Sequence, residues 1–227
     1  MKSGEDMSRI RVFTGHFGSG KTEIAINYAI NLAKGGSKVA IVDMDIVNPY
    51  FCVRDIKDYL EKEGIKVISS NPKFSNAELM VLPPEVLSAF NDKSYEVVID
   101  VGGDDIGAVA LGQYNRYFKE EPYDMYFVIN NNRPMTEDFL STEEYMINIE
   151  KSSRLKITHL ISNTNLSNET DVQDILHGDK VVSELSKQSN IPYKYTVIRK
   201  DLEDEARGKV AGELFPINIY MKKPWEQ

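Results

Sequence analysis

The sequence contains a single cysteine, Cys52, among its 227 residues. One cysteine excludes a disulfide within the chain and any Cys-x-x-Cys metal pair, and it is typical of a protein from a reducing compartment. No run approaches the roughly eighteen consecutive apolar residues that a membrane-spanning helix needs, and residues 1–9 lack the apolar centre of a secretion signal. These absences predict a cytoplasmic protein without membrane insertion.

Positive charge is also scarce. The chain has 27 lysines and arginines against 35 aspartates and glutamates, which gives a formal net charge of −8. No basic block stands out, so the sequence lacks the electrostatic footprint of nucleic-acid binding. Hydrophobic residues make up 41% and charged residues 27%, an ordinary globular composition. The length fits one α/β domain that spans residues 1–227.

Short β-branched runs alternate with segments of helical periodicity along the chain. This alternation predicts an α/β fold of three layers, α/β/α, with a mostly parallel sheet of about seven strands. Gly178 is expected to interrupt the last long helix, and three prolines in 71–84 favour a loop or a short helix there. The expected strands are 10–14, 38–43, 65–69, 95–101, 125–129, 155–161 and 193–198, and the expected helical segments are 21–34, 84–91, 106–119, 136–151, 171–188 and 202–207.

A glycine-rich segment between the first strand and the first helix fits the phosphate-loop pattern G-x-x-x-x-G-K-[ST] at every fixed position. Glycines allow successive backbone N–H groups to point inward, and the following helix adds its own free N–H groups and the positive end of its dipole. The alternative is a glycine-rich turn that happens to contain Lys-Thr. The nucleotide-binding residues predicted here are Gly15, His16, Phe17, Gly18, Ser19, Gly20, Lys21 and Thr22.

Two of these residues have side-chain roles in the prediction. Lys21 supplies a mobile positive charge for the β- and γ-phosphates, and Thr22 supplies a hydroxyl ligand for Mg²⁺. The pattern therefore predicts a protein that binds ATP or ADP together with Mg²⁺.

Carboxylates close two of the apolar strands. Asp43 and Asp45 end one strand, and Asp100 ends another in Val-Val-Ile-Asp-Val-Gly-Gly. Ligands of open α/β sheets bind at the carboxyl ends of the strands, so we expect these three carboxylates near Mg²⁺. The alternatives are a solvated turn for Asp43 and Asp45 and an ordinary helix N-cap for Asp100.

These motifs, in this order and spacing, resemble the MinD/ParA-like branch of P-loop ATPases, which includes CobQ/CobB-type and dethiobiotin synthetase-like relatives. The resemblance covers about the first hundred residues and extends more weakly to Leu-Ile-Ser-Asn163. It implies an Mg²⁺-dependent ATPase that switches partners and in many members forms a nucleotide-sandwiched homodimer. By position, Asp45 resembles the residue that orients the attacking water, and Asp100 resembles the residue near magnesium.

The resemblance also places Asn163 against the nucleotide base, where its amide can both donate and accept hydrogen bonds. The alternative for Asn163 is a loop-capping role. One departure concerns His16, which occupies the slot of the family's signature lysine and is mostly neutral near pH 7. Residues 130–134 lack the lysine and the acid of the guanine motif, which favours ATP over GTP.

Three functional hypotheses follow. The first is a slow ATPase switch in which Lys21 and Asp45 are catalytic, acting on an unidentified protein client. The second is an ATP-dependent ligase or phosphoryl-transfer enzyme of the dethiobiotin synthetase-like kind. The third is a binding module that takes nucleotide without useful hydrolysis, which agrees with a histidine at position 16.

Overall fold

The computed structural model describes residues 8–45, 52–69, 84–103 and 105–221. Eight strands form one sheet in the order β3-β2-β4-β1-β5-β6-β7-β8, and every neighbouring pair is parallel. The predicted α/β fold with a mostly parallel sheet is therefore confirmed. The strands are β1 (Ile10–Thr14), β2 (Lys38–Met44), β3 (Lys66–Ser69), β4 (Tyr95–Val101), β5 (Tyr123–Ile129), β6 (His159–Ser162), β7 (Tyr193–Arg199) and β8 (Glu213–Ile217).

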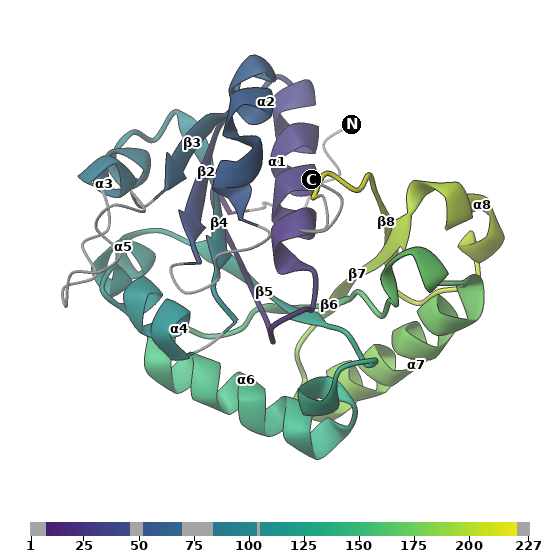
Figure 1. Cartoon of the computed structure of the whole chain (residues 1–227). Coiled ribbons are helices and arrows are strands. Elements are labelled where there is room, and N and C mark those ends of the chain that lie inside the picture. The colour runs from purple at the N-terminus through teal and green to yellow at the C-terminus, as the bar shows by residue number, and fades with distance from the viewer. Residues whose placement is uncertain (1–7, 46–51, 70–83, 104, 222–227) are drawn as a thin grey trace.

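Helices cover both faces of this sheet (Figure 1). One apolar core lies between the sheet and α3 to α7, and a second lies between the opposite face and α1 with α2. Parallel strands joined by crossover helices produce this three-layer arrangement, because both faces of such a sheet must be shielded from water. The helices are α1 (Lys21–Lys34), α2 (Lys57–Lys62), α3 (Pro84–Asn91), α4 (Asp105–Gly112), α5 (Asn115–Glu120), α6 (Phe139–Ser153), α7 (Val172–Ser189) and α8 (Glu203–Ala206).

The central strand β1 is buried along its whole length, and β2 is buried at all positions except its first. Continuous β-branched sequence suits such strands, since side chains on both faces enter a core. Because β1, β2 and β4 run side by side in parallel, their carboxyl ends meet at one edge of the sheet. The polar residues that follow these strands are thereby brought together.

Several expected elements differ from the structure. The sheet has eight strands rather than about seven, because β8 was not predicted; it is an edge strand, a position that tolerates Pro216. The expected strand 155–161 is reduced to β6, and the expected helix 106–119 is divided into α4 and α5.

The expected break at Gly178 is wrong, since α7 runs without interruption through that residue. A Cβ on Gly178 would lie 2.1 Å from Oγ1 of Thr164. The glycine therefore allows the helix to pass closely over the end of β6. Glycine at position 178 therefore permits close packing and does not end the helix.

Asp138 is the cap of α6, because its side chain accepts a hydrogen bond of 2.9 Å from the backbone N–H of Ser141. Most of the predicted loop 71–84 lies outside the described residues. Among the helices that the structure describes, none combines the length and the apolar character required to cross a bilayer.

Candidate functional site

The glycine-rich segment Gly15–Thr22 joins the carboxyl end of β1 to the first turn of α1 (Figure 1). Gly20 is the N-cap of α1 and has a φ of 84°, a left-handed conformation that glycine adopts without strain. A Cβ on Gly20 would also lie 2.3 Å from Nδ2 of Asn163. Gly20 has no side chain that could cap α1, which leaves the N–H groups of its first turn able to bind an anion.

Side chains from the neighbouring strands hold the loop by its carbonyl groups. Nδ2 of Asn163, after β6, donates to the Ser19 carbonyl at 2.7 Å. Nδ2 of Asn130, after β5, donates to the Gly18 carbonyl at 3.4 Å. Carbonyls used in this way leave the N–H groups of the loop to serve a ligand.

The position of Asn163 bears on its predicted role at the nucleotide base. Its side chain is buried, with 6% of the residue exposed, and its amide nitrogen is already bonded to the phosphate loop. The loop-capping alternative therefore describes its observed contact. A contact between its carbonyl oxygen and a base stays a prediction.

Lys21 and Thr22 follow Gly20 in the first turn of α1 and are both buried. Nζ of Lys21 lies 4.0 Å from Oδ2 of Asp45, and 5% of each side chain is exposed. Oγ1 of Thr22 donates a hydrogen bond of 2.7 Å to Oδ2 of Asp100. The structure thus brings together the predicted lysine, threonine and two of the three predicted carboxylates.

The third carboxylate, Asp43, lies directly opposite Asp100 in the register between β2 and β4. Its Oδ1 accepts the backbone N–H of Asp45 at 3.1 Å, and its Oδ2 lies 3.4 Å from Nη1 of Arg54. Arg54 belongs to the 3₁₀ helix η1 (Val53–Ile56). Three buried carboxylates therefore share the site with the cationic groups of Lys21 and Arg54.

The site holds more carboxylates than cationic groups, and the pKa values of two of these carboxylates are raised. Burial, reinforced by Asp43 and Asp45, raises the pKa of Asp100 to about 8, although Lys21 and the Thr22 hydrogen bond oppose the rise. Burial also raises the pKa of Asp43 to about 6, against the effect of Arg54. A cation bound at this edge would offset the repulsion and favour the ionised carboxylates.

The donor set at this edge fits Mg²⁺. Oδ1 of Asp100 is buried and has no hydrogen-bond partner among the described residues. Mg²⁺ normally takes one or two protein oxygens and completes its shell with waters and phosphate oxygens. The Thr22 hydroxyl and the Asp100 carboxylate are such donors, with Asp43 and Asp45 nearby. Within the described residues no group of three or more His, Cys, Asp or Glu side chains forms a ready-made metal cage.

Further orphaned polar atoms line the loop itself. Among the described residues, three more buried side-chain atoms near the loop lack a hydrogen-bond partner: Oγ1 of Thr14, Nδ1 of His16 and Oγ of Ser19. Buried polar atoms are normally paired, so this concentration is typical of a site that awaits a ligand or water.

His16 packs its ring edge-on against Tyr145 of α6, with ring centroids 5.4 Å apart. Burial lowers its pKa, and the charges of Lys21 and Arg133 lower it further. A neutral imidazole group is therefore favoured at the loop position where MinD/ParA-like ATPases carry their signature lysine. Phe17, the next residue, is 60% exposed at the crest of the loop.

Gly103 brings the segment after β4 against the phosphate loop. A Cβ at this position would lie 2.7 Å from the backbone nitrogen of Phe17 and 2.8 Å from the Gly15 carbonyl oxygen. The Tyr145 hydroxyl also donates to the Gly103 carbonyl. The absence of a side chain at Gly103 therefore permits this close approach to the loop.

From the sequence we assigned no role in the site to four residues: Arg54, Asn130, Arg133 and Tyr145. Asn130 carried a usable signal, because it is a polar residue directly after an apolar strand, as Asn163 is. Arg54 and Tyr145 lie on helical segments and reach the site only through tertiary packing, so no local pattern marks them.

No family model matches the sequence, and no curated protein matches it either. Solved structures do match its fold. Cell division protein FtsY from Thermotoga maritima aligns with a TM-score of 0.55 and 17% identity, over 84% of this chain and 62% of that one. Chloroplast FtsY from Physcomitrella patens aligns with a TM-score of 0.57 and 16% identity, over 84% and 58% of the two chains.

A third match is the signal recognition particle receptor FtsY from Elizabethkingia anophelis in complex with GDP. It has a TM-score of 0.53 and 18% identity, over 86% of this chain and 58% of that one. This chain spans about three fifths of the length of the solved chains that it matches. At these identities the matches show the fold, which is the α/β fold of P-loop NTPases. The narrower resemblance to MinD/ParA-like ATPases stays a prediction.

Proposed function

We propose that this chain is a single nucleotide-binding domain that holds a nucleoside triphosphate with Mg²⁺, hydrolyses it slowly and acts as a nucleotide-controlled switch on a protein partner. The hydrogen bond between Thr22 and Asp100 is the observation that carries this proposal. It joins a hydroxyl at the start of α1 to a carboxylate at the end of β4, beside the loop. That combination is the magnesium-holding pair of P-loop proteins.

Each residue of the site has a role in the proposal. The N–H groups of Gly15–Thr22 bind the phosphates, and Lys21 would leave Asp45 to contact the phosphate oxygens. When bound, Mg²⁺ would neutralise developing charge on the phosphates, held by Thr22 and Asp100. Asp45, released from Lys21, would orient the attacking water.

The identity of the base is a separate part of the proposal. We propose ATP, because the segment after β5 lacks the lysine and the acid that read guanine. One of the solved structures of similar fold contains GDP, so guanine nucleotides are the comparison to test. Tighter binding of GTP than of ATP would reverse the base assignment and leave the phosphate loop assignment intact.

A nucleotide-dependent binding module without useful hydrolysis is the second candidate function. The neutral His16 favours it, because the slot offers no permanent positive charge to stabilise a transition state. In both candidates the exposed Phe17 and the loop crest would face a partner, either a protein client or a second copy of the chain.

Binding and turnover of ATP, ADP, GTP and GDP with Mg²⁺ test the proposal. We expect Lys21→Ala to weaken triphosphate binding about 100-fold, because a charge-assisted contact is lost. Asp45→Ala should bind within about threefold of the wild type and lose turnover, since charge stabilisation by the loop remains. Lys187→Ala and Asp204→Ala, which alter exposed residues of α7 and α8, are the matched controls.

Three outcomes separate the parts of the proposal. A wild-type protein that binds neither ATP nor GTP at millimolar concentration removes the proposed function. Equal turnover in Asp45→Ala and the wild type removes the role of Asp45 alone. Tight binding without turnover, with partner capture that depends on the nucleotide, selects the binding module.

A further inference from the structure

Arg133 lies in a rigid turn directly after β5. Its backbone is extended, with φ −120° and ψ 134°, as expected for a residue before Pro134. Its N–H donates to the Asn130 carbonyl at 3.1 Å, and its own carbonyl accepts the N–H of Thr136 at 3.0 Å. Oγ1 of Thr136 closes the turn with a bond of 2.7 Å to the Asn130 carbonyl. These hydrogen bonds fix the backbone position from which the Arg133 side chain extends.

From this turn the side chain of Arg133 reaches the phosphate loop. Its Nε lies 3.4 Å from the Gly18 carbonyl oxygen and donates to it. A Cβ on Gly18 would lie 3.1 Å from Nε, 3.3 Å from Cζ and 3.5 Å from Nη2 of the arginine. The guanidinium group therefore rests on the loop, two residues from His16.

No carboxylate among the described residues pairs with the charge of Arg133. The other two cationic side chains at this edge face carboxylates, since Lys21 lies near Asp45 and Arg54 near Asp43. Arg133 forms no ion pair with any residue that the structure describes, and its side chain is exposed. A guanidinium with donors to spare, beside a ring of N–H groups, suits a phosphate oxygen.

We infer that Arg133 contacts the polyphosphate chain of the bound nucleotide from within the same molecule and favours triphosphate over diphosphate. The inference rests on the proposed function and adds a residue to it. A triphosphate carries more negative charge than a diphosphate, so an uncommitted cation at the loop stabilises it more. His16 leaves that part of the loop without a cation of its own, and Arg133 supplies one.

A purely structural role is the competing explanation, because Nε of Arg133 also braces the Gly18 carbonyl. Two substitutions separate the roles. Arg133→Lys keeps the positive charge, whereas Arg133→Gln keeps an amide donor and removes the charge. If charge is what matters, lysine preserves the preference for triphosphate. If bracing is what matters, glutamine preserves binding and the preference does not change.

The experiment measures dissociation constants of Mg²⁺–triphosphate and Mg²⁺–diphosphate by calorimetry, with the base that the wild type binds more tightly. We expect Arg133→Ala to weaken triphosphate binding about tenfold and diphosphate binding about threefold, as loss of one charge-assisted contact predicts. Arg133→Lys should stay within about threefold of the wild type, and Arg133→Gln should match the alanine variant. Arg207→Ala, which removes an exposed arginine of the α8 region, should match the wild type.

Thermal unfolding of each nucleotide-free variant accompanies the titrations and should show no change, because the turn is held by backbone groups and Thr136. Wild-type affinities for both nucleotides in Arg133→Ala would overturn the inference, and so would an equal loss for both that glutamine restores. If Lys21→Ala weakens binding while Arg133→Ala binds both nucleotides as the wild type does, the inference fails and the proposed function stands. If the wild type binds no nucleotide, the proposed function fails first.

Discussion

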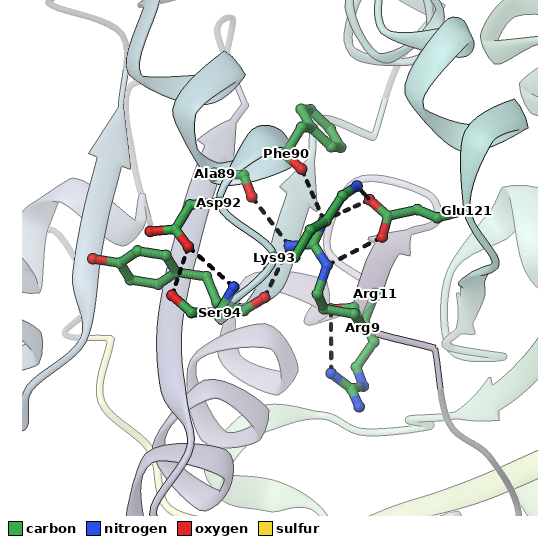
Figure 2. Close-up of polar contacts among 9 residues, drawn as sticks. Arg9, Arg11, Ala89, Phe90, Asp92, Lys93, Ser94 and Glu121 are labelled. Carbon is green, nitrogen blue, oxygen red and sulfur yellow. Dashed lines mark hydrogen bonds and ion pairs between the residues drawn. The ribbon is translucent and has the colours of Figure 1, made fainter.

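The two edges of the sheet differ in how completely their polar groups are matched. At the edge where the strands begin, Figure 2 shows Arg9 surrounded by acceptors. Its guanidinium forms an ion pair of 2.5 Å with Glu121, and Glu121 also contacts Lys93 at 2.6 Å. Although burial opposes the change, the two cations lower the pKa of Glu121. Arg9 also donates to the backbone carbonyls of Ala89, Phe90 and Tyr95.

At the edge where the strands end, matching is incomplete. Asp100 has one buried oxygen without a partner among the described residues, and its pKa is raised to about 8. Ser19 and Thr14 add two more unpartnered hydroxyl oxygens. The first edge is therefore matched by the protein's own groups, whereas the second keeps buried polar atoms without partners among the described residues, which is typical of a binding site.

The largest effect that tests this contrast is expected for Arg9→Ala. The change leaves Glu121 with Lys93 alone and removes the donor from three backbone carbonyls, so we expect a loss of roughly 2–4 kcal/mol in the free energy of unfolding. Nucleotide affinity of the folded fraction should stay unchanged, since Arg9 lies at the opposite edge from the loop. Urea unfolding and calorimetry measure the two quantities. If Arg9→Ala proves as stable as the wild type, the polar contacts at this edge do not stabilise the fold, and the difference drawn between the two edges is wrong.

Asp100→Asn tests the other edge through its pH dependence. Between the ordinary pKa of an aspartate and about 8, the folded chain keeps a proton that the unfolded chain has released. Stability of the nucleotide-free protein therefore falls as pH rises through that interval. The asparagine variant lacks this loss, so its advantage over wild type should grow by roughly 3 kcal/mol between about pH 5 and pH 8.

Urea unfolding at the two pH values, without Mg²⁺ or nucleotide, measures this difference. Identical pH slopes in the two proteins would show that Asp100 is already ionised when folded. The same variant should lose Mg²⁺-dependent nucleotide binding, because the neutral amide is a poorer ligand for a hard cation.

Asn163→Ala gives a smaller effect at the loop edge. It removes the hydrogen bond to the Ser19 carbonyl, and we expect a loss of about 1–2 kcal/mol in unfolding free energy and about fivefold in nucleotide affinity. Asn115→Ala is the matched control, because Nδ2 of Asn115 donates a similar bond to the Arg154 carbonyl far from the loop. The control should keep wild-type affinity. Equal affinity in both variants would mean that the brace does not affect binding.

The smallest effect is expected for Lys38→Ala, at the same edge as Arg9. Nζ of Lys38 lies 3.4 Å from Asp92, and about half of each side chain is exposed. Exposed pairs contribute roughly 0.2–1 kcal/mol and weaken with salt. Thermal unfolding at low and high salt should show a small difference that salt removes. If Lys38→Ala lowers the free energy of unfolding as much as Arg9→Ala does, burial does not explain the different contributions of the Lys38–Asp92 and Arg9–Glu121 ion pairs.

The geometry of the glycine-rich loop could be predicted from sequence because it depends on local backbone conformation. The glycines, Lys21 and Thr22 are adjacent in the chain, and their order alone fixes their arrangement at the start of a helix. Asp43 and Asp100 could be predicted as well, since each ends an apolar strand and parallel strands bring their ends together.

The remaining parts depended on contacts between distant segments. Arg54 reaches Asp43 from a 3₁₀ helix that no periodic pattern marks, and Arg133 reaches Gly18 across 115 residues of sequence. β8 was missed because the proline that it contains is acceptable only at a sheet edge, which is a property of topology. Gly178 was misread because a glycine that permits close packing looks the same in sequence as one that ends a helix.

The chain beyond β8 is bonded to the same helix that begins at the phosphate loop. Glu23, in the first turn of α1, accepts the backbone N–H groups of Tyr220 and Met221, and Asn27 exchanges two hydrogen bonds with Asn218. Burial raises the pKa of Glu23 against those bonds, so truncation after residue 217 would leave a shielded carboxylate without its donors. An affinity tag or fluorescent fusion that displaces this segment would therefore disturb the first helix.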